Sequence, residues 1–215
     1  MPFSDPLADG LTNQLAAERA LAAGMTQEKV FALVASLRAY TDRPIIFYTY
    51  YNLVLAHGER EFVRRCAEVG IDGVLTLDLP PEYAGGMVAA CREQGLKSVF
   101  IVAPTTPPER VALIAKSASG FIYYVSREGV TGERAELSPT IAPKVAEIRA
   151  HTDLPVAVGF GISKREHVRT IAGIADGAVV GSALVNCIGH AQGDRDTMIA
   201  NLDRKARDLI AGCAR

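Results

Sequence analysis

PVAVGFGISKREHVRTIAGIADGAVVGSA, residues 155–183, carries the pattern that decides the fold. Its apolar run at 155–160 predicts a strand, the stretch 164–171 predicts a helix, and the apolar run at 177–181 predicts a second strand. A glycine turn follows each strand, GIS at 161–163 and GSA at 181–183. Two near-continuous apolar strands joined by a helix indicate a parallel sheet covered by helices.

The same alternation runs through the rest of the chain. Strands are predicted at 44–51, 72–79, 98–103 and 121–126, and helices at 59–69, 81–94, 107–116, 139–150 and 197–210. A helical pattern extends from Thr12 to Ala39, with an interruption at Gly24 and a new start at Thr26. Asp72-Gly73-Val74 and Asp176-Gly177-Ala178 enter their strands in the same way. Such echoes suit a barrel of repeated βα units.

The predicted fold is therefore α/β, of the TIM-type (βα)8 barrel family, in a single domain that covers residues 1–215. A closed barrel of this type has eight strands, whereas the pattern predicts six. A helix-forming segment precedes the first predicted strand. Either the sheet is open, or two strands and the first helix belong before Met1.

Composition excludes several classes of protein. The 215 residues carry a formal net charge of −1, which gives no sign of a nucleic-acid or membrane-surface partner. No apolar run approaches the roughly 20 residues that span a bilayer, and the first residues have no signal-peptide pattern. The four cysteines, Cys66, Cys91, Cys187 and Cys213, form no CxxC pair. We expect Cys66 and Cys91, which lie in helical patterns, to be small buried thiols. We expect no metal site or disulfide among the four, which fits a reducing cytoplasm.

Three glycine-containing turns follow predicted strands at 127–133, 161–163 and 181–183. Glycine lets the main chain approach an anion, and a short helix at 183–188 would aim its N-terminus at the same oxygens. The alternative is that each turn is simply a tight exit from a strand. Three such turns on the loops where barrels carry their active sites favour phosphate binding, mostly by main-chain dipoles.

Several polar side chains stand out, each with a structural alternative. Asp9, in PFSDPLADG at 2–10, could cap the following helix or act as a base or cation stabiliser. Asp78 could cap the next helix or orient a hydroxyl in the barrel mouth. Tyr48 and Tyr50 share one face of their strand by the period-two rule. With Tyr123 they are either core residues or the lining of a pocket for an aromatic substrate.

A set of motifs in a fixed order carries a resemblance to a known family. PFSDPLADG at 2–10, YYNLV at 50–54, LDLPPEY at 77–83, SREGVTG at 126–132, GFGIS at 159–163 and GSALV at 181–185 occur in this order. The combination spans the chain and resembles the alpha subunit of tryptophan synthase. The resemblance implies cleavage of indole-3-glycerol phosphate to indole and glyceraldehyde 3-phosphate. It also implies an α2β2 tetramer, in which the beta subunit holds pyridoxal phosphate and this subunit needs no cofactor.

The resemblance also implies roles for individual residues. Asp9 is similar to the carboxylate that hydrogen-bonds the indole N–H, and SREGVTG resembles a mobile loop that closes over substrate. Tyr50 and Tyr123 would contact the substrate. The implied phosphate cradle consists of Gly132, Gly161, Gly181 and Ser182, and the supporting or beta-subunit contacts are Pro2, Asp5, Asn52 and Asp78.

One departure from the family is large. The family has a glutamate at the end of a strand just upstream of the PFSDP loop, which is its acid/base at indole C3. Met1 stands where that region would begin. We therefore expect a start assigned too late, with the missing strands encoded upstream. As given, the chain would expose two strand edges, be poorly stable and be nearly inactive alone.

Three functions remain open at this point. The first is the lyase subunit, and the second is a non-catalytic partner that binds and modulates the beta subunit. The third is a different isomerase or lyase built on a phosphate-binding barrel. The ordered motifs argue against the third.

Overall fold

A parallel six-stranded sheet forms the centre of the computed structural model, which describes residues 1–126, 138–159, 161–191 and 193–213. Within these residues the strands follow chain order and every neighbouring pair is parallel. They are β1 (Ile46–Thr49), β2 (Gly73–Thr76), β3 (Lys97–Val102), β4 (Ile122–Val125), β5 (Val156–Gly159) and β6 (Gly177–Val179). The prediction of six parallel strands is confirmed.

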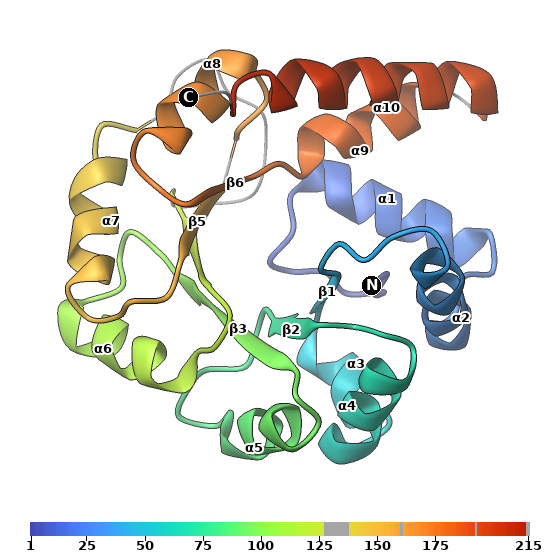
Figure 1. Cartoon of the computed structure of the whole chain (residues 1–215). Coiled ribbons are helices and arrows are strands. Elements are labelled where there is room, and N and C mark those ends of the chain that lie inside the picture. Colours follow the sequence, from blue (N-terminus) through green and yellow to red (C-terminus); the bar gives the residue numbers. More distant parts are fainter. Residues whose placement is uncertain (127–137, 160, 192, 214–215) are drawn as a thin grey trace.

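Helices surround the sheet, which curves as an arc in Figure 1 with the helices on its outer side. They are α1 (Leu11–Ala22), α2 (Gln27–Arg38), α3 (Tyr51–Leu55), α4 (Glu59–Glu68), α5 (Gly85–Glu93), α6 (Pro108–Ser117), α7 (Ile141–Arg149), α8 (Arg165–Ala172), α9 (Ser182–His190) and α10 (Arg195–Ile210). Between sheet and helices lies the apolar core. At the β1 side its centre is an aromatic cluster in which Phe31 packs edge-on against Phe47 and Phe62, at 5.5 and 5.8 Å between ring centroids.

The two similar strand entries, Asp72-Gly73-Val74 and Asp176-Gly177-Ala178, make the same set of contacts. The Oδ2 atom of Asp72 accepts from the Ile45 N–H at 2.7 Å and pairs with Arg38. At the other side of the sheet, Asp176 Oδ2 accepts from the Val156 N–H at 2.9 Å and from Arg149 at 3.0 Å. Each aspartate thus ties the start of its own strand to the start of the preceding strand and to the end of the helix before that strand, α2 for Asp72 and α7 for Asp176. This repeat is the physical reason for the echo in the sequence.

Several predicted boundaries were wrong. The strand predicted at 72–79 ends at Thr76, and the helix predicted at 81–94 begins at Gly85. The strand predicted at 44–51 ends at Thr49, and residues 51–55 form helix α3. The Tyr51 N–H donates to Asp78 Oδ1 at 2.7 Å, so a side chain from beyond β2 satisfies the first turn of α3. Of the two roles considered for Asp78, the structure therefore has a helix cap, on α3 and not on the helix that follows it.

The ends of the sheet differ from its middle. In the described sheet, β1 and β6 each pair with a single strand. Helices bridge this side, since α1 packs against α9 (Figure 1). The Met1 nitrogen donates to the Tyr48 carbonyl at 2.7 Å, at β1 itself. The idea that two further strands belong before Met1 stays a prediction.

The burial predicted for Cys66 and Cys91 is confirmed, whereas Cys187 is half-buried and Cys213 is exposed. Cys66 and Cys91 are buried free thiols, and burial raises the pKa of both. Among the described residues, no group of three or more potential ligands could hold a metal ion, and no helix is long and apolar enough to cross a membrane.

Candidate active site

A cavity of about 560 Å³ lies inside the arc of the sheet. The strands form one wall, with apolar side chains such as Ile46, Leu75 and Val179. Helix α1 forms the opposite wall through a stripe at helical spacing, Asn13, Ala16, Ala17 and Ala20. Polar groups concentrate at two places in this lining. We call Asp9, Asn13, Tyr48 and Tyr50 the carboxylate end, and Gly161, Gly181 and Ser182 the glycine end.

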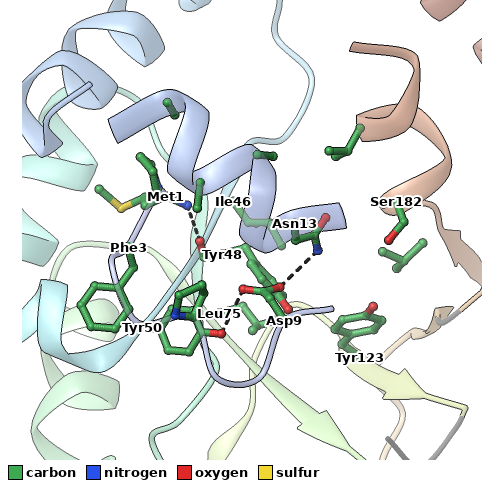
Figure 2. Close-up of a pocket in the computed structure, with 18 of the residues that line it drawn as sticks. Met1, Phe3, Asp9, Asn13, Ile46, Tyr48, Tyr50, Leu75, Tyr123 and Ser182 are labelled. Atoms are coloured by element: carbon green, nitrogen blue, oxygen red, sulfur yellow. Dashed lines mark hydrogen bonds between the residues drawn. The ribbon is translucent and has the colours of Figure 1, made fainter. Parts of the chain in front are cut away.

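Asp9 is held at the carboxylate end by side chains from two segments. A turn places it, because the Asp9 N–H donates to the Pro6 carbonyl at 3.0 Å. Tyr50 Oη donates to its Oδ2 at 2.9 Å and Asn13 Nδ2 to its Oδ1 at 3.1 Å, as Figure 2 shows. Asp9 is 6 % exposed. The alternative that Asp9 caps the next helix is wrong: Gly10 is the N-cap of α1, and no side chain caps it.

Three tyrosines surround this carboxylate. Tyr48 and Tyr50 both line the cavity, as the period-two rule predicted, and Phe47 points to the core on the other face. Burial, followed by the negative charge of Asp9, raises the pKa of Tyr48 and brings that of Tyr123 to about 12. Burial and the hydrogen bond to Asp9 also raise the pKa of Tyr50. All three are therefore neutral hydroxyls at physiological pH, able to donate a hydrogen bond.

Tyr123 lies between the two ends of the cavity in Figure 2, on the side toward Ser182. The residue that makes room for its ring is Gly159 on the neighbouring strand. A Cβ atom there would come within 2.5 Å of the Tyr123 hydroxyl and 2.6 Å of its ring. Any side chain at 159 would push the ring into the cavity. The sequence showed Gly159 within GFGIS, but this packing role was not predicted.

The glycine end is made by two strand exits. Gly161 has φ of +81°, a conformation that side chains with a Cβ rarely adopt. Gly181 is the N-cap of α9, and Ser182 and Ala183 in its first turn also face the cavity. The helix predicted at 183–188 is thus present as Ser182–His190. Gly132, the remaining glycine of the predicted cradle, lies outside the described residues.

The structure separates the other predicted residues into two groups. Pro2, Asp9, Tyr50, Tyr123, Gly161, Gly181 and Ser182 all line the one cavity. Asp5, Asn52 and Asp78 are exposed and lie outside its described lining. The resemblance marks Asn13 only as a departure near the indole pocket, where the family often has isoleucine. Its contact with Asp9 was not predicted, although its spacing with Ala16, Ala17 and Ala20 on the helical pattern was a signal that could have found it.

Comparisons with known proteins agree with this geometry. The family model described as tryptophan synthase alpha chain matches residues 1–213. The tryptophan synthase alpha chain of Opitutus terrae is 60 % identical over 215 residues, which is all of this chain and 81 % of that protein. The chain is a member of the tryptophan synthase alpha-chain family. The predicted membership is confirmed, and with it the assignment to the lyases of tryptophan biosynthesis that cleave indole-3-glycerol phosphate.

More distant members and solved structures support the family. The alpha chain of Methanothermobacter thermautotrophicus is 46 % identical over 212 residues, 98 % of this chain and 78 % of that protein. A structure of the Pyrococcus furiosus tryptophan synthase a2b2 complex superposes with a TM-score of 0.89 at 41 % identity, over 97 % of this chain and 84 % of that one. A chain from Aquifex aeolicus gives 0.86 at 40 % identity, over 100 % and 80 %. The six-stranded sheet is thus part of a TIM-type fold.

Proposed function

We propose that the cavity binds indole-3-glycerol phosphate with its indole ring at the carboxylate end and its phosphate at the glycine end. The observation that carries this proposal is that Asp9, Tyr123, Gly161 and Ser182 line one cavity of about 560 Å³. That volume is in the range of small-molecule sites, which are mostly apolar with a few placed polar groups. An elongated ligand with an aromatic head and an anionic tail matches this distribution.

Asp9 would accept a hydrogen bond from the indole N–H. When C3 of the indole is protonated and the bond to the glycerol chain breaks, positive charge spreads onto the ring nitrogen. A buried carboxylate fixed in advance by Tyr50 and Asn13 stabilises that charge without reorganising. Tyr123 would contact the glycerol chain between the two ends.

The phosphate would be held by main-chain N–H groups. The turn at Gly161 and the first turn of α9, from Gly181 and Ser182, face the same cavity. A helix N-terminus carries partial positive charge and unpaired N–H groups, which suit a phosphate. Gly132 would complete this cradle.

A second function is favoured by one observation. In the described lining, Asp9 is the single carboxylate, and no glutamate faces the cavity. A lyase of this type needs a group that transfers a proton at C3 in addition to the group that stabilises the ring. The second candidate is therefore a non-catalytic partner that binds and modulates the beta subunit.

One experiment separates the two functions. The 215-residue chain is mixed with a cognate beta subunit, and indole release from indole-3-glycerol phosphate is measured beside the synthesis of tryptophan from indole and L-serine. For the lyase we expect indole release that Asp9→Asn reduces by roughly a hundredfold. Modulation of the beta reaction without indole release would support the non-catalytic partner. No effect on either reaction would overturn both.

We also propose that the beta subunit is the partner, since the Pyrococcus furiosus structure is described as a mutually activated a2b2 complex. No cofactor is assigned to this chain, and pyridoxal phosphate would belong to the beta subunit of a cytoplasmic α2β2 tetramer. Exposed Asp5 and exposed Asn52, which Asp78 presents by capping α3, would contact the partner. Pro2 would connect that surface to the cavity. Asp5→Ala and Asn52→Ala should weaken capture of the beta subunit in a pull-down, while Tyr40→Ala, exposed in the connection between α2 and β1, should not.

A further inference from the structure

The glycine end has no cationic side chain of its own, because neither GIS at 161–163 nor GSA at 181–183 contains Lys or Arg. A cation nevertheless reaches the first of these turns from a distant part of the chain. Lys205 of the C-terminal helix α10 donates from Nζ to the Ser163 carbonyl at 2.6 Å. Among the ion pairs of the described residues, Lys205 takes part in none. Its hydrogen-bond partner in the described residues is therefore a main-chain carbonyl of the turn.

The same residue of the turn is held from its other side. The Ser163 N–H donates to Nδ1 of His167 on α8, at 3.4 Å. Ser163 is 3 % exposed and His167 is 6 % exposed. Both main-chain polar groups of Ser163 are thus occupied by side chains from two different helices. The turn that carries Gly161 has a fixed shape as a result.

The two helices are themselves fastened together. Arg165 at the start of α8 donates to Asp208 Oδ1 on α10 at 3.1 and 2.8 Å. Gly212, just after α10, packs so closely on α8 that a Cβ atom would lie 2.5 Å from the Arg165 carbonyl. The position of α10 is therefore coupled to the start of α8 and to the turn before it.

We propose that Lys205 is a positioning residue for phosphate binding, acting together with His167 through Ser163. This inference rests on the proposed phosphate cradle and adds to it a cation from α10. Lys205 does not touch the phosphate. It holds the turn by its hydrogen bond and adds positive potential behind the main-chain N–H groups, where partial burial limits screening by solvent.

The test measures binding of inorganic phosphate and, separately, of indole by calorimetric titration of the whole chain. Lys205→Met should weaken phosphate binding roughly tenfold, the effect expected of one partly buried charge near the ligand. Lys205→Arg, which keeps the charge, should recover most of the affinity. Indole carries no phosphate, so its affinity should stay within about twofold of the parent in both variants.

Arg204→Met is the matched control, because it removes an exposed positive charge from the adjacent position of the same helix. It should leave phosphate binding within about twofold of the parent. Phosphate affinity in Lys205→Met equal to that in Arg204→Met would overturn the inference. So would an equal loss of indole and phosphate binding, which would mean that Lys205 only supports the fold.

Failure of the cradle itself gives a different result. If a bulky residue at Gly161 leaves phosphate binding at the level of the parent, the phosphate site is elsewhere and this inference falls with it. If the Gly161 variant loses binding and Lys205→Met does not, the cradle stands and the role of Lys205 is wrong.

Discussion

The carboxylate end and the glycine end of the cavity are built from different parts of the chain. At the carboxylate end, side chains supply the polar groups. Asp9 accepts hydrogen bonds from Tyr50, which is 41 residues away in sequence, and from Asn13. At the glycine end, the main chain faces the cavity, and the supporting side chains, Lys205 and His167, stand behind it. Among the residues that line the cavity, loss of a polar side-chain group should therefore damage the carboxylate end, and an added side chain should damage the glycine end.

The glycine end should be the more easily broken. Gly161→Val should reduce inorganic phosphate binding at least about a hundredfold, because the β-branched side chain resists a φ of +81° and would stand in the cavity lining. Calorimetric titration with phosphate measures this loss.

Gly58→Val is its matched control. Gly58 has φ of +79°, so the variant carries the same backbone strain, and a Cβ there meets no atom within 4 Å. Equal phosphate affinities in the two variants would mean that strain alone, and not the site, explains the effect.

The carboxylate end should respond to loss of charge without loss of volume. Asp9→Asn should weaken indole binding about tenfold, since a hydrogen bond to a neutral acceptor is weaker than one to a carboxylate. Phosphate binding should stay unchanged, because the glycine end does not depend on this group. The measurement is a pair of titrations, one with indole and one with phosphate.

Asp5→Asn removes an exposed carboxylate from the same N-terminal segment and serves as the control. A parallel fall in phosphate binding in Asp9→Asn would show that the two ends are not independent.

The sequence predicted most of the framework for a physical reason. The buried strands are largely apolar and the turns at 161–163 and 181–183 contain glycine, and both signals are local. Helix α3 was missed because YNLVL at 51–55 continues the apolar character of the strand before it. What ends the strand is Asp78, which caps α3 from beyond the next strand.

The residues of the candidate site also fall into those that local sequence predicts and those that depend on tertiary contacts. Gly161, Gly181 and Asp9 lie in motifs that can be read from neighbouring residues. The residues that hold them in place cannot be found from sequence neighbours. Lys205 and Ser163, for example, are 42 residues apart in sequence and meet only when α10 packs against α8. Gly159 was visible as a glycine, but its purpose depends on the Tyr123 ring of the adjacent strand.

The smallest expected difference between the two ends is their response to high pH. Tyr48, Tyr50 and Tyr123 have pKa values raised by burial and by Asp9, so the folded chain keeps protons that the unfolded chain loses near pH 10. The contribution of these protonated tyrosines to stability is fully present below about pH 10. It is lost as pH rises through their pKa values in the folded state. Each tyrosine can lower the free energy of unfolding by at most about 1.4 kcal/mol per pH unit.

Urea unfolding of the parent and of Tyr48→Phe at pH 9, 10 and 11 checks this dependence. Tyr48→Phe keeps the ring and removes one titrating hydroxyl, so its stability should fall less steeply above pH 10. Tyr40→Phe is the control, because Tyr40 is 86 % exposed, and its slope should match that of the parent. If Tyr48→Phe and the parent lose the same stability per pH unit, burial and the charge of Asp9 do not raise the pKa of the Tyr48 hydroxyl. The carboxylate end would then consist of Asp9, Tyr50 and Asn13 without Tyr48.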